Sequence, residues 1–269
     1  MEKRKEEIMK FVFLLAACAS IATVAMICLF LFANGLPTIG KIGAADFFLG
    51  ERWRPANDVY GILPMILGSL YITAGAIVIG VPIGLLTAVF MAFYCPKKLY
   101  GLLKPCTELL AGIPSIVYGL FGMLFFVTYL KWSYSLLAGS CTVAIMILPL
   151  IMRTTEEALK AIPDSYREGS YGLGAGKLRT VFAIVLPSAI PGILAGVILG
   201  IGRIVGETAA LMYTSGTVAA LPHNVFSSGR TLAVHMYVLA SEGLFMKQAY
   251  ATAVILVVIV IAINAASSY

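Results

Sequence analysis

Long apolar runs separated by short polar segments dominate the pattern along the chain. A helix that spans a bilayer needs about 20 consecutive apolar residues. Runs that meet or approach this length occur at residues 11–33, 62–94, 105–130, 134–152, 186–212 and 249–264. The pattern therefore predicts an all-α integral membrane protein with about six transmembrane helices.

Composition supports this prediction and excludes other classes. Apolar residues make up 60% of the 269 residues and charged residues only 12%, about half of the roughly 25% that is typical of soluble domains. The mean hydropathy is +0.96. These values exclude a soluble globular domain and a disordered chain. The five cysteines have no metal-ligand spacing, so neither a metal site nor a disulfide framework is expected.

The basic residues predict the orientation in the membrane. An even number of spans places both termini on one side. With the N-terminus inside, the inner segments hold twelve Lys and Arg residues and the outer segments hold six. The excess favours cytoplasmic N- and C-termini in a multi-pass protein of the cell (inner) membrane. The net charge of +6 thus reflects topology, and nucleic acid is not an expected partner.

The spacing of the runs also predicts the domain organisation. We expect a cytoplasmic N-terminal tail (1–10), a first transmembrane helix (11–33), an external loop (34–61) and a membrane core (62–269) with a polar cytoplasmic loop (153–184). In that loop, Asp164 or Ser165 can cap a helix that follows Pro163. Three glycines then interrupt the helix, and a second short helix is predicted at 177–183.

The cytoplasmic loop contains the most specific motif. It reads Glu168-Gly169-Ser170, three residues, Gly174, nine residues, then Ile184-x-Leu186-Pro187. This spacing resembles the coupling motif of ABC importer permeases, Glu-Ala-Ala, three residues, Gly, nine residues, Ile-x-Leu-Pro. The resemblance implies a type I ABC importer permease fold, with a cytoplasmic helix pair that docks on a separate ATPase subunit.

A second glycine pattern in the same loop imitates a nucleotide site. Gly174-Ala-Gly176-Lys177 looks like the end of a phosphate-binding P-loop, but that motif requires a glycine five residues before Gly176 and Ser or Thr after the lysine. Tyr171 and Leu178 occupy those positions. We therefore expect no cofactor and no enzyme activity in this chain, with ATP bound by the partner subunit.

The fifth apolar run contains small residues and charges in separate patterns. Gly192, Gly196 and Gly200 recur every four residues, which predicts close helix packing. Arg203 and Glu207 follow four residues apart, so they are expected on one helix face within the membrane.

Two interpretations of this charged pair are open. It is either a structural ion pair or an oxyanion site in which Glu207 holds the guanidinium of Arg203 in place. Arg153 and Arg230 are further candidates for a path of positive potential, although both are also typical of anchors at the membrane surface.

Three motifs narrow the resemblance. Gly202-Arg203-Ile-Val-Gly206-Glu207-Thr208-Ala is similar to the Arg-x-x-Gly-Glu-Thr signature of permeases from the high-affinity phosphate importer, and the segments 60–71 and 108–119 also resemble that family. The resemblance implies phosphate passage at Arg203 and Glu207. It also implies as partners a second homologous permease, two copies of a cytoplasmic ATPase and an extracytoplasmic phosphate-binding protein.

Alternatives stay open at this point. The outer loop resembles one of the two homologous permeases and the C-terminal run resembles the other. A permease for another oxyanion, such as sulfate or molybdate, or for an amino acid would share the coupling loop. A channel or ion-coupled transporter would need no ATPase, but the coupling loop argues against it.

Overall fold

The computed structural model describes residues 2–267. Met1, Ser268 and Tyr269, which the predicted tail and core included, lie outside the described residues. The elements are α1 (Glu2–Ile42), α2 (Ala44–Leu49), β1 (Trp53–Arg54), the 3₁₀ turn η1 (Pro55–Asn57), β2 (Val59–Tyr60), α3 (Leu63–Val89), the π-helical turn η2 (Phe90–Tyr94), α4 (Lys97–Ala111), α5 (Ser115–Gly122), the π-helical turn η3 (Met123–Tyr129), α6 (Leu136–Lys160), α7 (Asp164–Gly172), α8 (Lys177–Thr180), the π-helical turn η4 (Val181–Val185), α9 (Leu186–Val205), α10 (Ala209–Met212), α11 (Leu232–Glu242) and α12 (Met246–Ser267).

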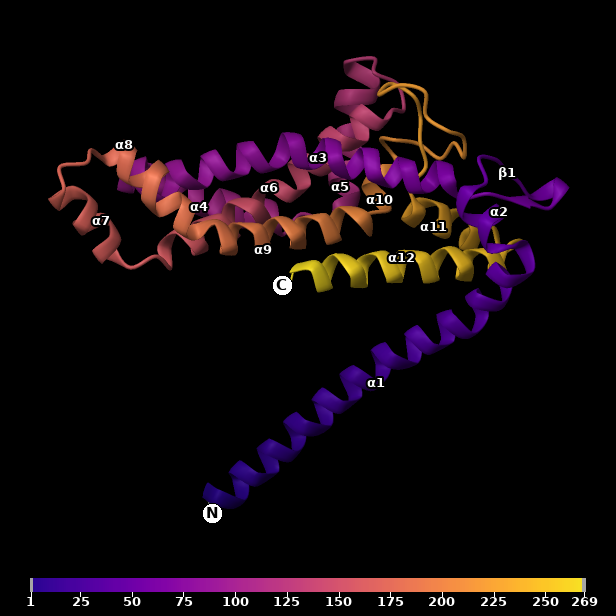
Figure 1. The fold of residues 1–269 in the computed structure, drawn as a ribbon, viewed down its shortest axis with the longest axis horizontal. Helices are drawn as coiled ribbons and strands as arrows, with labels where there is room; N and C mark the ends of the chain where they lie inside the picture. Colours follow the sequence, from indigo (N-terminus) through magenta and orange to yellow (C-terminus); the bar gives the residue numbers. More distant parts are fainter. Residues whose placement is uncertain (1, 268–269) are drawn as a thin grey trace.

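The predicted all-α membrane architecture is confirmed. Five helices are long and apolar enough to cross a bilayer, and a bent pair would make a sixth span. The five are Lys5–Ile42, Leu63–Tyr94, Leu136–Lys160, Lys177–Val205 and Met246–Ala266. Among the described residues, strands occur only in the short hairpin of β1 and β2. Figure 1 shows α3, α6, α9 and α12 running lengthwise through the molecule.

The third predicted span, 105–130, is wrong as a straight helix. The structure ends α4 at Ala111 and starts α5 at Ser115, and the two helical segments meet at 96°. Pro114 explains the break, because proline disfavours helical geometry at the residue before it and supplies no backbone N–H. The α4 half is amphipathic and contains no buried residue.

The cytoplasmic helix pair differs from its prediction in its second member. The segment at 177–183 is not a separate short helix, because α8 continues through η4 into α9 as one span, Lys177–Val205. The fifth span also ends seven residues earlier than residue 212, since Gly206 closes α9 and a new short helix, α10, starts at Ala209.

The first helix is longer than the predicted span at 11–33. It begins at Glu2 and ends at Ile42, so it includes most of the predicted tail and the start of the predicted external loop. The C-terminal part of α1 packs against α12, where a Cβ on Gly35 would lie 2.7 Å from the carbonyl oxygen of Tyr250. Toward its N-terminus α1 diverges from the other helices (Figure 1).

Close packing of α3 against α6 forms the centre of the core. Glycines on α3 allow the two backbones to approach, and a Cβ on Gly84 would lie 2.8 Å from Cγ2 of Ile151. The main apolar cluster also includes residues of α9, α10 and α11. Its fully buried members include Ile72, Ala76, Val143, Ile147, Ile151, Ile204, Leu211 and Val234.

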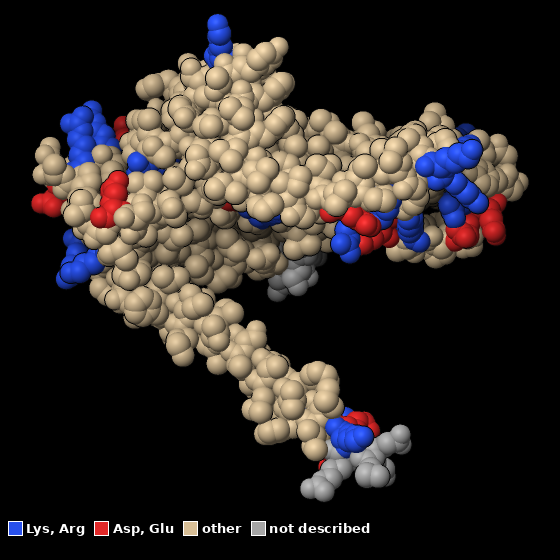
Figure 2. All heavy atoms as spheres, turned by 180° about the vertical axis from the view of Figure 1, so that it is seen from behind, with Lys and Arg blue, Asp and Glu red and all other residues tan. Residues whose placement is uncertain are grey.

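Charged side chains are concentrated at the ends of the molecule. In Figure 2 most Lys, Arg, Asp and Glu residues lie toward the two ends of the bundle and at the N-terminal end of α1, with a broad surface between them that carries few charges. Lipid can cover such a belt without desolvating charges, which is the distribution expected of a membrane-spanning bundle.

Candidate functional site

A helix-turn-helix at one end of the bundle contains the predicted docking motif. Ser170 on α7 and Thr180 on α8 are both buried, and their hydroxyl oxygens lie 2.8 Å apart. Gly174, in the turn between the two helices, has a φ of +80°, a conformation that glycine adopts without strain. The small residue and the glycine of the motif therefore fix how the two helices are joined.

The outer face of this helix pair is exposed and partly apolar. Glu168 and Gly169 are exposed on α7, and a Cβ on Gly169 would meet no atom within 4 Å. Leu173 is 91% exposed, an unusual state for a leucine at the tip of a turn. Other large exposed apolar side chains of the helix pair are Tyr166, Tyr171 and Leu178. An apolar patch next to a carboxylate is typical of a protein-binding surface.

Contacts to η2, the turn that follows α3, hold the helix pair in position. Lys177 donates a hydrogen bond to the backbone carbonyl of Phe93, and its ammonium lies 4.7 Å from the ring centroid of Tyr94. The guanidinium of Arg167 lies 5.8 Å from the ring centroid of Phe93. Cation–π contacts of this kind join the surface helices to the membrane core.

The last residues of the motif lie where the helix pair enters the core. Ile184 and Leu186 are half-buried and Pro187 is exposed. Val185, between them, is buried in an apolar cluster with Leu159 of α6. The motif thus joins an exposed surface to the packed base of α9.

The structure does not bring Arg203 and Glu207 together as an ion pair. Arg203 is in the last turn of α9 and is exposed, and no ion pair between the two is present among the described side chains. Glu207 is only 8% exposed, and its Oε1 accepts a hydrogen bond of 3.1 Å from the backbone N–H of Ala210. The expectation that both share one helix face is wrong, because α9 ends between them at Gly206.

The glycine stripe of α9 faces α6 at all three positions, and the approach is tight at two of them. A Cβ on Gly192 would lie 2.7 Å from Cβ of Ala158, and one on Gly196 would lie 2.6 Å from Cβ of Thr154. At Gly200 the nearest atom would be 3.4 Å away, which is ordinary contact. The two helices therefore approach more closely along the first half of α9 than at Gly200.

Arg153 and Arg230 occupy different surroundings, and neither contacts Arg203 among the hydrogen bonds and ion pairs described. Nε of Arg153 lies 2.9 Å from Oε1 of Glu157, with both side chains exposed. Arg230 lies at the opposite end of the molecule, where it donates a 2.7 Å hydrogen bond to the carbonyl of Thr217.

A buried histidine completes the Arg230 environment. Nη1 of Arg230 lies 3.1 Å from Nδ1 of His235, and the ring of Trp53 makes an edge contact with the imidazole at 4.3 Å. Burial, and secondarily the charge of Arg230, lowers the pKa of His235 to about 3. Burial likewise lowers the pKa of Arg230.

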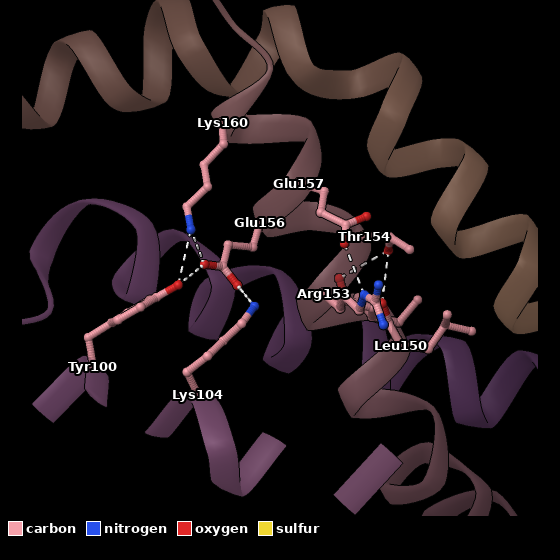
Figure 3. Close-up of polar contacts among 9 residues, drawn as sticks. Tyr100, Lys104, Leu150, Arg153, Thr154, Glu156, Glu157 and Lys160 are labelled. Atoms are coloured by element: carbon pink, nitrogen blue, oxygen red, sulfur yellow. Dashed lines mark hydrogen bonds and ion pairs between the residues drawn. The ribbon is translucent and has the colours of Figure 1, made fainter. Parts of the chain in front are cut away.

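Sequence analysis missed a polar cluster centred on Glu156, near the C-terminal end of α6 (Figure 3). The Glu156 side chain is 4% exposed. Its carboxylate accepts hydrogen bonds from the Tyr100 hydroxyl at 2.6 Å, from Lys104 at 2.8 Å and from Lys160. The first two donors come from α4 and the third from α6. Only the Glu156–Lys160 spacing of four residues was visible as a signal in the sequence.

Cation sites are not evident in the part of the chain that the structure describes. In residues 2–267, no group of three or more His, Cys, Asp and Glu side chains is arranged to hold a metal ion.

Comparison with known protein families extends this description. The family model "Binding-protein-dependent transport system inner membrane component" matches residues 80–269. Among curated relatives, the probable ABC transporter permease protein YqgI of Bacillus subtilis is 36% identical over 198 residues, covering 68% of this chain and 67% of the relative.

Relatives named as phosphate permeases are also similar. The phosphate transport system permease protein PstC of Mesorhizobium japonicum is 29% identical, covering 89% of this chain and 81% of that protein. PstA 1 of Mycobacterium tuberculosis, named in the same way, is 32% identical, covering 80% and 71%.

Solved structures agree on the fold. An inward-facing MetNI methionine ABC transporter chain matches with a TM-score of 0.65 at 22% identity, covering 81% of this chain and 96% of that one. A bacterial ABC transporter chain involved in import of the acidic polysaccharide alginate matches with a TM-score of 0.63 at 16% identity, covering 98% of both. The predicted type I ABC importer permease fold is confirmed.

Proposed function

The chain belongs to the family of binding-protein-dependent transport system inner membrane components, and we propose that it is a permease subunit of an ATP-driven importer of inorganic phosphate. The observation that carries this proposal is the similarity to named phosphate permeases over 80–89% of the chain. The Arg203-to-Thr208 signature supports the same substrate.

The exposed helix pair is the proposed contact between this chain and the ATPase that powers transport. Two cytoplasmic ATPase subunits would bind the importer, one of them at the surface around Glu168 and Leu173 of this chain. These side chains offer a carboxylate beside apolar groups, which suits a groove with basic and apolar walls. In this proposal ATP is bound and hydrolysed by the partner, and this chain supplies no nucleotide site.

Arg203 is the proposed phosphate contact in the translocation path. Its planar guanidinium can donate paired hydrogen bonds to an oxyanion, and its exposure at the end of α9 leaves these donors accessible. Glu207 has a different role from the expected clamp, since it is fixed to the start of α10.

The remaining partners complete the proposed transporter. A second, homologous permease would face this chain across the path, and an extracytoplasmic binding protein would deliver phosphate. The helix pair, α4 and the N-terminus would then lie in the cytoplasm, as the distribution of basic residues predicts.

The test is uptake of labelled phosphate by the assembled transporter in vesicles. We expect Arg203→Gln to abolish uptake while the subunits still copurify, and Arg203→Lys to retain part of it. Arg52→Gln, which removes an exposed arginine outside the proposed path, is the matched control. Uptake by the Arg203→Gln variant at unchanged affinity would remove Arg203 from the path. Equal competition by sulfate or molybdate would widen the substrate class to oxyanions.

A further inference from the structure

A cavity of about 580 Å³ lies between the end of α1, the β1–β2 hairpin and the start of α12. Its volume is in the range of small-molecule sites, about 300–1,000 Å³. Its walls combine polar groups with apolar ones. The lining residues are Ala33, Asn34, Pro37, Thr38, Lys41, Ile42, Asp58, Tyr60, Lys247 and Gln248.

The α1 wall of this cavity is a polar stripe on an otherwise apolar helix. Asn34, Thr38 and Lys41 are spaced at i, i+4 and i+7, so they share one helix face. Polar residues on one face of a membrane helix indicate a partner of matching chemistry there. Lys41 is in the last turn of α1, where the apolar run ends.

The opposite wall is the beginning of another span. Lys247 and Gln248 are in the first turn of α12, whose N-terminal end contributes positive potential. The two lysines therefore lie at the same boundary of the membrane, one where a span ends and the other where a span begins.

The charges in the cavity are not neutralised within the chain. Lys41 and Lys247 provide two positive charges and Asp58 one negative charge. None of the three forms an ion pair among the described side chains, and Asp58 instead accepts a 3.1 Å hydrogen bond from the Tyr60 hydroxyl. The cavity thus has an excess of one positive charge.

We propose that this cavity binds the phosphodiester headgroup of an anionic phospholipid. The phosphate would lie between Lys41 and Lys247, and the apolar lining at Ala33, Pro37 and Ile42 would contact the glycerol backbone and the first carbons of the acyl chains. A monoanionic phosphodiester complements the single excess charge. A free phosphate ion shares the oxyanion chemistry but would leave the apolar lining uncovered. The site is separate from Arg203 and does not depend on which solute is transported.

The experiment is native mass spectrometry of the full-length protein in detergent, titrated with phosphatidylglycerol. A lysine near an anionic lipid contributes about 1 kcal/mol, so Lys41→Gln and Lys247→Gln should each weaken binding about fivefold and the double variant about thirtyfold. The matched control is the double variant Arg52→Gln and Arg54→Gln, which removes two exposed charges from the same region outside the cavity. This control should bind lipid as the unaltered protein does.

A third variant tests the effect of the negative charge in the cavity. Asp58→Asn removes the negative charge, and asparagine tolerates the positive φ of 52° at this position, so we expect phosphatidylglycerol to bind more tightly. Two results would overturn the proposal. One is equal lipid binding by the lysine double variant and its arginine control. The other is displacement of phosphatidylglycerol by millimolar inorganic phosphate, which would identify a site for the free ion.

Discussion

The Glu156 cluster makes the sharpest prediction about how α4 is attached to α6. Replacing Glu156 by Gln removes the charge that holds Tyr100 and Lys104 of α4 against α6. Because Glu156 is almost fully buried, its bonds are little weakened by solvent, although Lys104 itself is 31% exposed.

The size of the effect follows from the bonds that are lost. A hydrogen bond to a charged group contributes about 1.5–3 kcal/mol and a neutral one about 0.5–1.5 kcal/mol. The Gln amide oxygen can still accept one bond, so we expect the attachment of α4 to weaken by about 2 kcal/mol. Lys160 contributes less to this attachment, because it comes from α6 itself and is 55% exposed.

Hydrogen exchange measured peptide by peptide is the appropriate assay. A loss of about 2 kcal/mol corresponds to roughly thirtyfold faster exchange in α4, with little change in α12. The neighbouring variant Glu157→Gln is the matched control, because Glu157 forms only an exposed pair with Arg153, and such pairs contribute about 0.3–0.5 kcal/mol. If both variants exchange at the same rate in α4, the Glu156 cluster does not hold this helix.

Three further predictions test packing, pH dependence and docking. Gly196→Ala should lower the stability of the purified protein by about 1–3 kcal/mol, because the added Cβ would overlap Thr154. Gly200→Ala is the control and should be nearly neutral. Equal losses of stability in the two variants would contradict this packing. Since His235 stays neutral in the folded state down to about pH 3 but takes up a proton near pH 6.5 when unfolded, stability should fall by about 2 kcal/mol between pH 7.5 and pH 5. Melting curves should show that His235→Gln removes this contribution and that His223→Gln, at an exposed position, does not. Gly174→Asp should leave the protein in the membrane but prevent copurification of the ATPase, and normal copurification would argue against docking at this turn.

The sequence predicted those helices that are determined by residues close together in the chain. Apolar length alone identified the five long spans, and the glycines of the polar loop predicted where α7 ends. Breaks within apolar runs were missed, because Gly112-Ile113-Pro114 and Gly206 lie in segments that are as apolar as the helices around them. Hydropathy counts such residues as part of a span, whereas backbone geometry ends the helix there.

The polar sites depended on contacts between distant segments. Tyr100 and Glu156 are 56 residues apart in sequence, and no periodicity relates them. For Arg203 and Glu207, a spacing of four predicted a shared face only if the helix continued, and it does not. The proposed roles of both residues remain predictions, now with different geometry for each.

The continuous helix from Lys177 to Val205 connects the helix pair directly to the Arg203 region. At 1.5 Å per residue, its 29 residues span about 43 Å, with the proposed docking surface at one end and Arg203 at the other. A displacement of the Lys177 end would move the Arg203 end directly, because both belong to one continuous helix. No chain of side-chain contacts is then needed to couple the two ends. The continuous helix also fixes how the two ends are rotated relative to each other about the helix axis. Inserting a single residue in the middle of α9 would turn Arg203 by about 100° relative to the docking surface and would separate ATP hydrolysis from movement of the solute without altering either site.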